Sequence, residues 1–398
     1  MFRFLSAGES HGPALVAILE GLPAGLPIDR AAIDADLRRR QGGYGRGGRM
    51  KIERDAVELL SGVRHGHTLG APITLRIENR DWANWTERMS PDPLAPAAAP
   101  PERVTRVRPG HADLTGALKY GRDDVRDVIE RASSRETAAR VAVGAVCRQL
   151  LGAFGVGIHS HVLSVGGVGY ATDARPDVGA ADKVFWERVE ASEMRCADAE
   201  LTAAIIARIL EGKRDGDTCG GVFEVAAHGV PVGLGSYSQW DRRLSTRVAA
   251  ALMSIPSVKG VEIGVGFALA DLPGSRVHDV VRYDAGDATS PGGWRHLTNN
   301  AGGIEGGISN GEPIVARVAV KPIPTLAHPL PSADVATGEN VEVTRYERSD
   351  VCVVPAAGVV GEAMLAIALA EAWIEKFGGD SLDEMRRNVE SYLATLKR

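Results

Sequence analysis

Residues 61–77 read SGVRHGHTLGAPITLRI, and residues 302–318 read GGIEGGISNGEPIVARV. Glycines, a Pro-Ile pair and an arginine fall at matching places in these two stretches. Two shorter blocks also recur with equal spacing: GESHG at 8–12 and GLPAGL at 21–26 return as GDTCG at 216–220 and GVPVGL at 229–234. A repeat with such a long period predicts two related halves packed together, and it argues against a solenoid of short repeats.

The pattern of apolar residues predicts a mixture of strands and helices. Runs of β-branched residues bounded by glycine or proline predict strands at 14–20, 73–77, 222–226, 261–267 and 314–320. Helices are expected at 133–154, which opens with capping-box spacing, at 242–253 and at about 359–377. No linker separates these elements, so we expect one α/β (α+β) domain over 1–398, with pseudo-repeat halves at about 1–155 and 210–380.

The composition is that of an ordinary globular chain. Of the 398 residues 44% are hydrophobic and 24% are charged, and the net charge is −5. The four cysteines are far apart and form no metal or redox pair, which is typical of a reducing compartment. The sequence shows no signal-peptide pattern and no apolar run that approaches a bilayer span. We therefore expect a cytoplasmic protein with no membrane partner.

Arginines are concentrated in glycine-rich sequence near the N-terminus. The stretch LRRRQGGYGRGGRM at 37–50 holds five arginines, and AGESHG at 7–12 places Ser10 and His11 between glycines. Guanidinium groups on a backbone that allows close approach suit a multiply charged phosphate or carboxylate ligand. Histidine can transfer a proton near neutral pH. Together the two stretches predict a site for an anionic substrate with a proton-transfer group beside it.

Other motifs add candidates for the same site. RPGHAD at 108–113 sets His111 after a Pro-Gly turn, and RASSRE at 131–136 offers hydroxyls and amides at a helix start, where phosphate binds well. KPIPT at 321–325 follows an expected strand, the place where α/β proteins collect ligands. His65 and His67 lie close together but no carboxylate or cysteine accompanies them at ligand spacing, so we expect no metal site.

These motifs resemble the signatures of the chorismate synthase family, in the family's order and over essentially the whole chain. The matching stretches are AGESHG, RRRQGGYGRG, RPGHAD, RASSRET and NNAGGIEGG. The resemblance implies a β-α-β sandwich with an internal two-fold pseudo-repeat, assembled as a homotetramer. It also implies a lyase that removes phosphate and a proton from 5-enolpyruvylshikimate 3-phosphate by trans-1,4-elimination. The product would be chorismate, at the last common step of the shikimate pathway to aromatic amino acids, and reduced FMN would be required without net redox change.

Roles for single residues follow from the same resemblance. His11 matches the acid near the departing phosphate, His111 the histidine beside the reduced flavin, and Asp350 the carboxylate that assists proton abstraction. The substrate-binding positions are Ser10, Arg40, Arg46, Arg49, Arg108, Arg135 and Arg348. The cofactor-binding positions are Arg40, Arg46, Arg131, Ala132, Ser133, Pro256, Ser257, Gly306, Lys321, Pro322, Ile323, Pro324, Thr325 and Arg348. The first two also match positions credited with NADP contacts. The family usually has Asn or Gln and then Ala where this chain has Pro256 and Ser257, so the side-chain amide is missing here.

Two other classes of protein share some of these features. An arginine–glycine RNA-binding segment would look like 38–49, but the net charge is negative and aromatic residues are not interleaved beyond Tyr44, so we expect no nucleic-acid partner. A flavin-dependent oxidoreductase would share the cofactor but would oxidise or reduce its substrate. The sequence leaves open whether NADPH reduces the flavin on this chain. Because no separate reductase module is present, an external flavin reductase is favoured.

Overall fold

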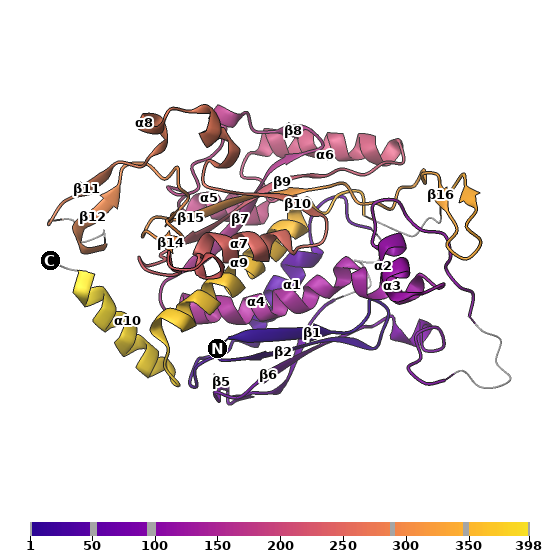
Figure 1. The fold of residues 1–398 in the computed structure, drawn as a ribbon, viewed down its shortest axis with the longest axis horizontal. Coiled ribbons are helices and arrows are strands. Elements are labelled where there is room, and N and C mark those ends of the chain that lie inside the picture. The colour runs from indigo at the N-terminus through magenta and orange to yellow at the C-terminus, as the bar shows by residue number, and fades with distance from the viewer. Residues whose placement is uncertain (1, 48–53, 94–100, 287–290, 345–349, 397–398) are drawn as a thin grey trace.

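Two antiparallel sheets enclose a layer of helices (Figure 1). The computed structural model describes residues 2–47, 54–93, 101–286, 291–344 and 350–396. The first sheet has the order β1-β2-β6-β3, with β1 (Arg3–Ala7), β2 (Ala14–Glu20), β3 (Val57–Ser61) and β6 (Ile73–Glu78). The second has the order β10-β15-β9-β7-β8, with β7 (Gly157–Val165), β8 (Val168–Gly169), β9 (Gly221–His228), β10 (Val258–Ile263) and β15 (Ile314–Val320).

The two sheets repeat the same topology. The order β1-β2-β6-β3 of the first corresponds to β7-β9-β15-β10 in the second, and every pairing is antiparallel. In each half a short hairpin directly precedes an inner strand of the sheet. β4 (Val63–Arg64) with β5 (His67–Thr68) precedes β6, and β13 (Ile304–Glu305) with β14 (Ile308–Ser309) precedes β15. The repeat of sequence motifs therefore coincides with a repeat of strand order. The expected α+β fold class is confirmed, while the limits of the halves stay a prediction.

Four helices form the layer between the sheets: α1 (Arg30–Gln41), α4 (Thr137–Gly152), α7 (Leu244–Met253) and α9 (Val354–Phe377). α4 packs against β2 and β6 of the first sheet, and α9 packs against β7 and β9 of the second. The two helices contact each other where Gly144 meets Ala363, because a Cβ on Gly144 would lie 2.4 Å from the Ala363 Cβ. This close approach brings the two halves onto one shared core.

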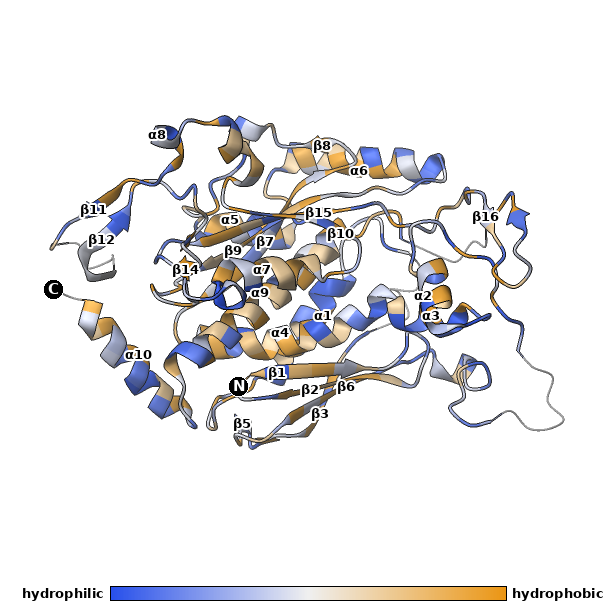
Figure 2. Cartoon of the chain, in the orientation of Figure 1, coloured by the Kyte–Doolittle hydropathy of each residue, from blue (hydrophilic) through white to orange (hydrophobic). Residues whose placement is uncertain are grey.

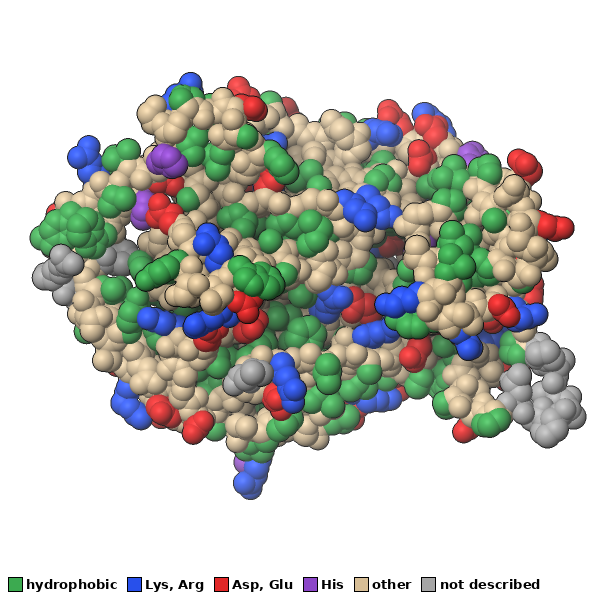
Figure 3. Space-filling model, in the orientation of Figure 1, with side chains coloured by type: hydrophobic (Ala, Val, Ile, Leu, Met, Phe, Trp, Pro, Cys, Tyr) green, Lys and Arg blue, Asp and Glu red, His purple; other side chains and the backbone are tan. Residues whose placement is uncertain are grey.

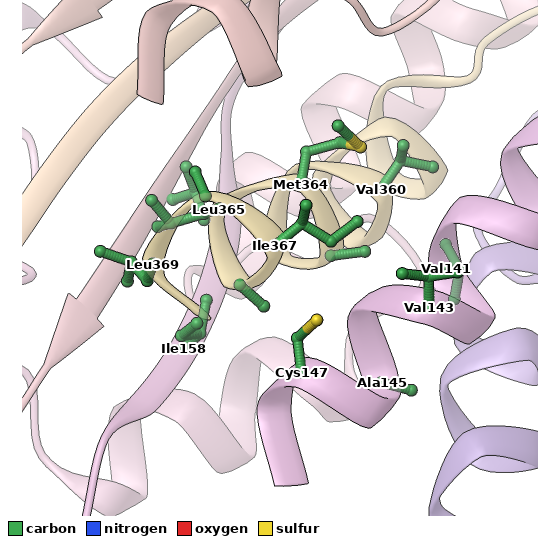
Figure 4. Close-up of a cluster of buried hydrophobic side chains, with 14 of the residues drawn as sticks. Val141, Val143, Ala145, Cys147, Ile158, Val360, Met364, Leu365, Ile367 and Leu369 are labelled. Atoms are coloured by element: carbon green, nitrogen blue, oxygen red, sulfur yellow. The ribbon is translucent and has the colours of Figure 1, made fainter. Parts of the chain in front are cut away.

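The shared core is built mainly from aliphatic side chains of α4, α9 and β7 (Figure 4). Figure 2 shows much of α4, α7 and α9 coloured toward the hydrophobic end of the scale, whereas α1 is mostly blue. By length and composition α9 could cross a membrane, but 89% of its most apolar window is buried inside the protein. α9 therefore has the burial of a core helix.

The structure agrees with most of the expected elements and corrects some of their limits. The strands expected at 14–20 and 314–320 are β2 and β15. The strand expected at 261–267 was misplaced: β10 is Val258–Ile263, because Gly264 and Gly266 have φ values of +60° and +65° and end it. Ser133 caps only a 3-10 turn at Ser134–Glu136, so α4 itself begins at Thr137.

The remaining elements surround this core. The other helices are α2 (Asp113–Tyr120), α3 (Arg126–Ala132), α5 (Lys183–Ala191), α6 (Ala199–Arg214), α8 (Gly274–Val277) and α10 (Leu382–Leu396). The other strands form two small hairpins, β11 (Val281–Tyr283) with β12 (Trp294–His296) and β16 (Ser332–Ala333) with β17 (Asn340–Val341). Of these, α2 and α3 carry or adjoin residues of the candidate site.

Candidate active site

A cavity of about 810 Å³ opens where α3 and the N-terminal ends of α4 and α9 come together. Its volume is within the range of small-molecule sites. Many of the residues named from the sequence line it: Ser10, His11, Arg40, Arg46, Arg108, His111, Ala132, Ser133, Arg135, Pro256, Ser257, Lys321, Ile323, Pro324 and Thr325. Figure 3 shows lysine and arginine side chains gathered on the face next to α2 and α3. Motifs far apart in the sequence thus meet in one place.

Some candidates lie elsewhere. Arg49 and Arg348 fall outside the described residues. Arg131 does not line the cavity; its guanidinium donates to the carbonyl oxygens of Ser6 at 2.9 Å and Gly8 at 3.0 Å, which holds the chain just before Ser10.

Three further candidates are also absent from the cavity wall. Gly306 belongs to the turn between β13 and β14, and Pro322 packs beside Gly220. Asp350 is not part of the wall either, but its carboxylate lies 2.7 Å from Arg46, whose side chain does line the cavity. Asp350 therefore adjoins the cavity through its ion pair with Arg46.

His11 sits on the turn between β1 and β2, held by α3. Its backbone N–H donates to Glu130 Oε2 at 2.8 Å, and its Nδ1 lies 3.0 Å from both carboxylate oxygens of Glu130. The imidazole also stacks on the Trp85 ring, with centroids 3.8 Å apart. The turn itself requires glycine at position 8, where φ is +106° and a Cβ would lie 2.3 Å from the Ala14 carbonyl oxygen. The Glu130 carboxylate thus holds one edge of the His11 ring, and the Trp85 ring covers one of its faces.

The charge on Glu130 decides which ring nitrogen of His11 carries a proton. Burial acts to raise the pKa of this carboxyl, but hydrogen bonds and charge from His11 and a hydrogen bond from Arg126 outweigh it and hold the pKa below its ordinary value. Arg126 Nη1 lies 3.1 Å from Glu130 Oε1. Since an ionised carboxylate only accepts hydrogen bonds, Nδ1 of His11 must be the donor, and the proton is assigned there.

His111 has a similar arrangement with a different carboxylate. Its Nδ1 lies 2.5 Å from Asp113 Oδ1, and Asp113 is fully buried. Burial acts to raise the pKa of Asp113, but hydrogen bonds from His111 and Arg108 hold it far below its usual range. Arg108 donates to Asp113 through Nε at 2.8 Å and Nη2 at 3.0 Å. Nδ1 therefore carries a proton here as well, and its 3.0 Å approach to Arg108 Nη2 is a contact between two donors.

Buried arginines form the floor of the cavity. Arg135 Nη1 lies 2.6 Å and Arg40 Nη1 3.7 Å from the same Asp55 carboxylate. Arg40 also donates to Thr137 Oγ1 at 2.8 Å. Both arginines are about 5% exposed, so their charges act in a place of low dielectric. An anionic ligand in the cavity would interact favourably with them.

An apolar part of the cavity wall comes from the start of α9 and from the segments around 255 and 323. It consists of Ile255, Pro256, Ile323, Pro324, Val353, Ala356, Ala357 and Val360. Lys321 is the charged residue at its edge, with Nζ donating to the Gly110 carbonyl at 2.6 Å. Burial, together with the charge of Lys259, lowers the pKa of Lys321. Flat apolar ligand surface fits against such a wall, while polar groups of the ligand reach the arginines.

Among the site residues that sequence reasoning missed, Asp81, Trp85 and Arg126 line the cavity, and Glu130 supports His11. Asp81 accepts a hydrogen bond from Trp85 Nε1 at 2.9 Å and so fixes the ring on which His11 stacks. One signal was present, because Arg126 and Glu130 have the i,i+4 spacing of a helix ion pair. That spacing alone is typical of a solvated helix face, and the segment around Trp85 has no such pattern.

Fold and site together define a class of protein: an α+β protein with a cavity whose histidines, arginines and apolar surface suit a small polyanionic ligand. A family model described as Chorismate synthase matches residues 2–374. Curated proteins named "Chorismate synthase" from Trichlorobacter lovleyi and Geobacter metallireducens are each 55% identical to this chain. The first alignment covers 99% of both chains and the second covers 100% of both.

A solved structure described as "Crystal Structure of Chorismate Synthase" has a TM-score of 0.79 and 44% identity, and the match covers 99% of this chain and 98% of that one. The chain belongs to the chorismate synthase family. Its members are lyases of aromatic amino acid biosynthesis. The resemblance drawn from the motifs is thereby confirmed. In the part of the chain that the structure describes, no cluster of three or more His, Cys, Asp or Glu side chains could hold a metal ion.

Proposed function

We propose that this chain converts 5-enolpyruvylshikimate 3-phosphate to chorismate and phosphate by trans-1,4-elimination with reduced FMN, the last common step of the shikimate pathway. The observation that carries the proposal is the pairing of two cavity histidines with two buried carboxylates among arginines. A substrate with one phosphate and two carboxylates needs several cations in one closed site. Family membership supports the same reaction.

His11 is the proton donor to the departing phosphate. Its Nδ1–H is held by Glu130, so Nε2 is the ring nitrogen that we assign to the proton transfer. Arg40, Arg135 and Arg108 bind the phosphate and carboxylate groups and stabilise the charge that develops as phosphate leaves. A general acid contributes about 10²–10⁴-fold to such a step.

The apolar wall and the segments beside it fit a flavin. Ala132, Ser133, Ser257 and the 321–325 segment would hold it, and Ala356 and Ala357 would add apolar surface beside them. The chemistry that reduced FMN supplies when bound is transient electron donation, because the elimination has no net redox change. Arg108 Nη1 lies 3.2 Å from Thr325 Oγ1, so the His111 side of the cavity is joined directly to this segment. His111 holds its proton at Nδ1 with Asp113 and presents its other nitrogen to the cofactor side.

Asp350 assists removal of the substrate proton. Its pairing with Arg46 and the hydrogen bond from the Gly47 N–H at 2.5 Å hold its carboxylate next to the cavity. Arg49 and Arg348 complete the substrate clamp, and Gly306 the cofactor site, as the family motifs imply. We further propose a cytoplasmic homotetramer that receives reduced flavin from an external reductase, with NADPH as the alternative source of electrons.

The proposal is tested by an anaerobic assay with photoreduced FMN and no other electron acceptor. We expect chorismate and inorganic phosphate in equal amounts, and no product when the flavin stays oxidised. An oxidised or reduced substrate without phosphate release would instead identify a flavin-dependent oxidoreductase. Absence of any product from a folded, flavin-loaded protein would refute the proposal.

A further inference from the structure

Glu130 of α3 makes several hydrogen bonds to the turn that carries His11, and no motif in the sequence indicated them. Its backbone carbonyl accepts from the Ser10 N–H at 2.9 Å, and its carboxylate accepts from the His11 N–H at 2.8 Å. The same carboxylate holds His11 Nδ1 at 3.0 Å. One residue of α3 thus fixes the backbone and the ring of the proposed proton donor together.

The surroundings keep Glu130 ionised and in place. Its side chain is 1% exposed, and Arg126, one helical turn earlier on α3, lies 3.1 Å from Oε1. On the other side of the imidazole, Trp85 stacks on the ring face. Rotation of the His11 ring would break contacts to Glu130 and to Trp85 at once, so the ring is held in a single orientation.

We propose that Glu130 is the positioning residue for His11, setting its tautomer and stabilising the positive charge that His11 carries before it donates a proton. The inference rests on the proposed function. In the step, the Nε2–H bond of His11 breaks and an O–H bond forms on the departing phosphate, while the N–H electron pair stays on Nε2. Nδ1 keeps its proton and Glu130 stays ionised throughout. Glu130 acts through His11 and does not itself touch the substrate.

A double-mutant cycle separates this role from a purely structural one. Glu130→Gln keeps the size of the side chain and removes its charge, so we expect kcat to fall about 10²-fold while KM for the substrate changes less than about threefold. In a His11→Ala background the same substitution should change kcat by less than about threefold, because the group through which Glu130 acts is already gone. Equal losses in both backgrounds would overturn the proposal.

Two further variants make the result specific. Glu130→Asp keeps the charge but shortens the side chain, and we expect a loss smaller than that of Glu130→Gln; a larger loss would contradict the assigned charge role. Glu136→Gln is the matched control, since Glu136 is also buried in this segment but pairs with Arg140 at 3.1 Å and does not line the cavity. Near-parental kcat is expected for it. If Glu130→Gln does not fold, the cycle is run with Glu130→Asp and the same criterion of non-additivity applies.

A measurement without turnover keeps this inference distinct from the proposed function. With ¹⁵N-labelled histidine, the ring nitrogens of His11 report their protonation in the resting protein. We expect a protonated Nδ1 in the parent, and loss of this single preferred tautomer in Glu130→Gln, because a glutamine amide can either accept from Nδ1 or donate to it. An unchanged His11 spectrum in that variant would refute the role of Glu130 even if the parent makes chorismate. A parent that makes no chorismate, with the His11 spectrum changed as expected, would refute only the proposed reaction.

Discussion

The two halves of the molecule meet at the cavity through equivalent helices, α4 and α9, yet they bring opposite chemistry to it. The 3-10 turn before α4 supplies the Arg135 guanidinium and the first residue of α4 the Thr137 hydroxyl, whereas the start of α9 supplies Ala356 and Ala357. Among the described residues that line the cavity, every arginine precedes residue 155, and the later part of the chain contributes one lysine, Lys321. One half offers an anion site and the other an apolar wall.

The difference shows that the repeat kept the strand order and changed the side chains. His11 in GESHG occupies the place that Cys219 has in GDTCG. His11 lines the cavity, but Cys219 is 3% exposed. The backbone of Cys219 forms an isolated parallel β-bridge with that of Cys352, and both thiols are free. Burial raises the pKa of the Cys219 thiol, as expected of an inert core cysteine. The matching motif therefore places a histidine at the cavity in one half and a buried cysteine in the core in the other.

The largest expected effect is the loss of turnover when a cavity histidine of the first half is replaced, and this result tests the comparison of the two halves most directly. We expect His11→Ala and His111→Ala to fold and to lose about 10²–10⁴-fold in kcat. Folding survives because the carboxylates left behind stay paired, Glu130 with Arg126 and Asp113 with Arg108. Turnover is measured by phosphate release, and folding by thermal unfolding.

The control for these variants is His67→Ala, because His67 is exposed in the β4–β5 hairpin. It should keep full turnover. Near-parental turnover in either cavity variant would remove that histidine from the mechanism, and the first half would then supply only binding charge.

A smaller effect tests the apolar wall of the second half. Ala357→Phe adds a large side chain where α9 lines the cavity. We expect flavin affinity to fall at least about tenfold, since overpacking a site costs about 1–3 kcal/mol. The arginines are untouched, so binding of inorganic phosphate should change little. Flavin binding is followed by FMN fluorescence. Ala204→Phe on the exposed face of α6 is the control. Equal loss of flavin and phosphate binding in Ala357→Phe would mean that the two walls do not act separately.

The sequence was informative where rare residue types cluster. Histidine and arginine between glycines in three separate motifs were enough to assemble most of the anion side of the cavity. Pro256, Ile323 and Pro324 of the apolar wall were named from the family resemblance, but its α9 residues were not predicted, because the alanines and valines of α9 have the composition of any buried helix. Glu130 was missed for a similar reason. Its partner His11 is 119 positions away in the chain, and no local pattern reports such a contact.

The smallest expected effect concerns charge outside the cavity. Arg39 and Arg40 are neighbours on α1, but only Arg40 lines the cavity. Arg39 donates to Glu362 at 2.8 Å and to Glu190 at 2.6 Å, so here the arginine is neutralised by carboxylates of other elements. Burial acts to raise the pKa of Glu190, but hydrogen bonds from Arg39 and Arg195 lower it to about 2. Arg39, which lies outside the cavity, thus has its charge balanced by carboxylates of the protein itself.

Because the folded pKa of Glu190 lies below its unfolded value of about 4.3, its ionised form stabilises the fold above that pH, and the stabilisation is lost as pH falls toward 2. We expect Glu190→Gln to lower Tm modestly at pH 7 and to match the parent near pH 2. The effect is small since Glu190 is 39% exposed and screened by solvent. Glu187→Gln, on the same helix but in an exposed pair with Lys183, should change Tm less at every pH. A Tm difference between Glu190→Gln and the parent that is constant from pH 7 to pH 2 would show that Glu190 contributes packing and not charge.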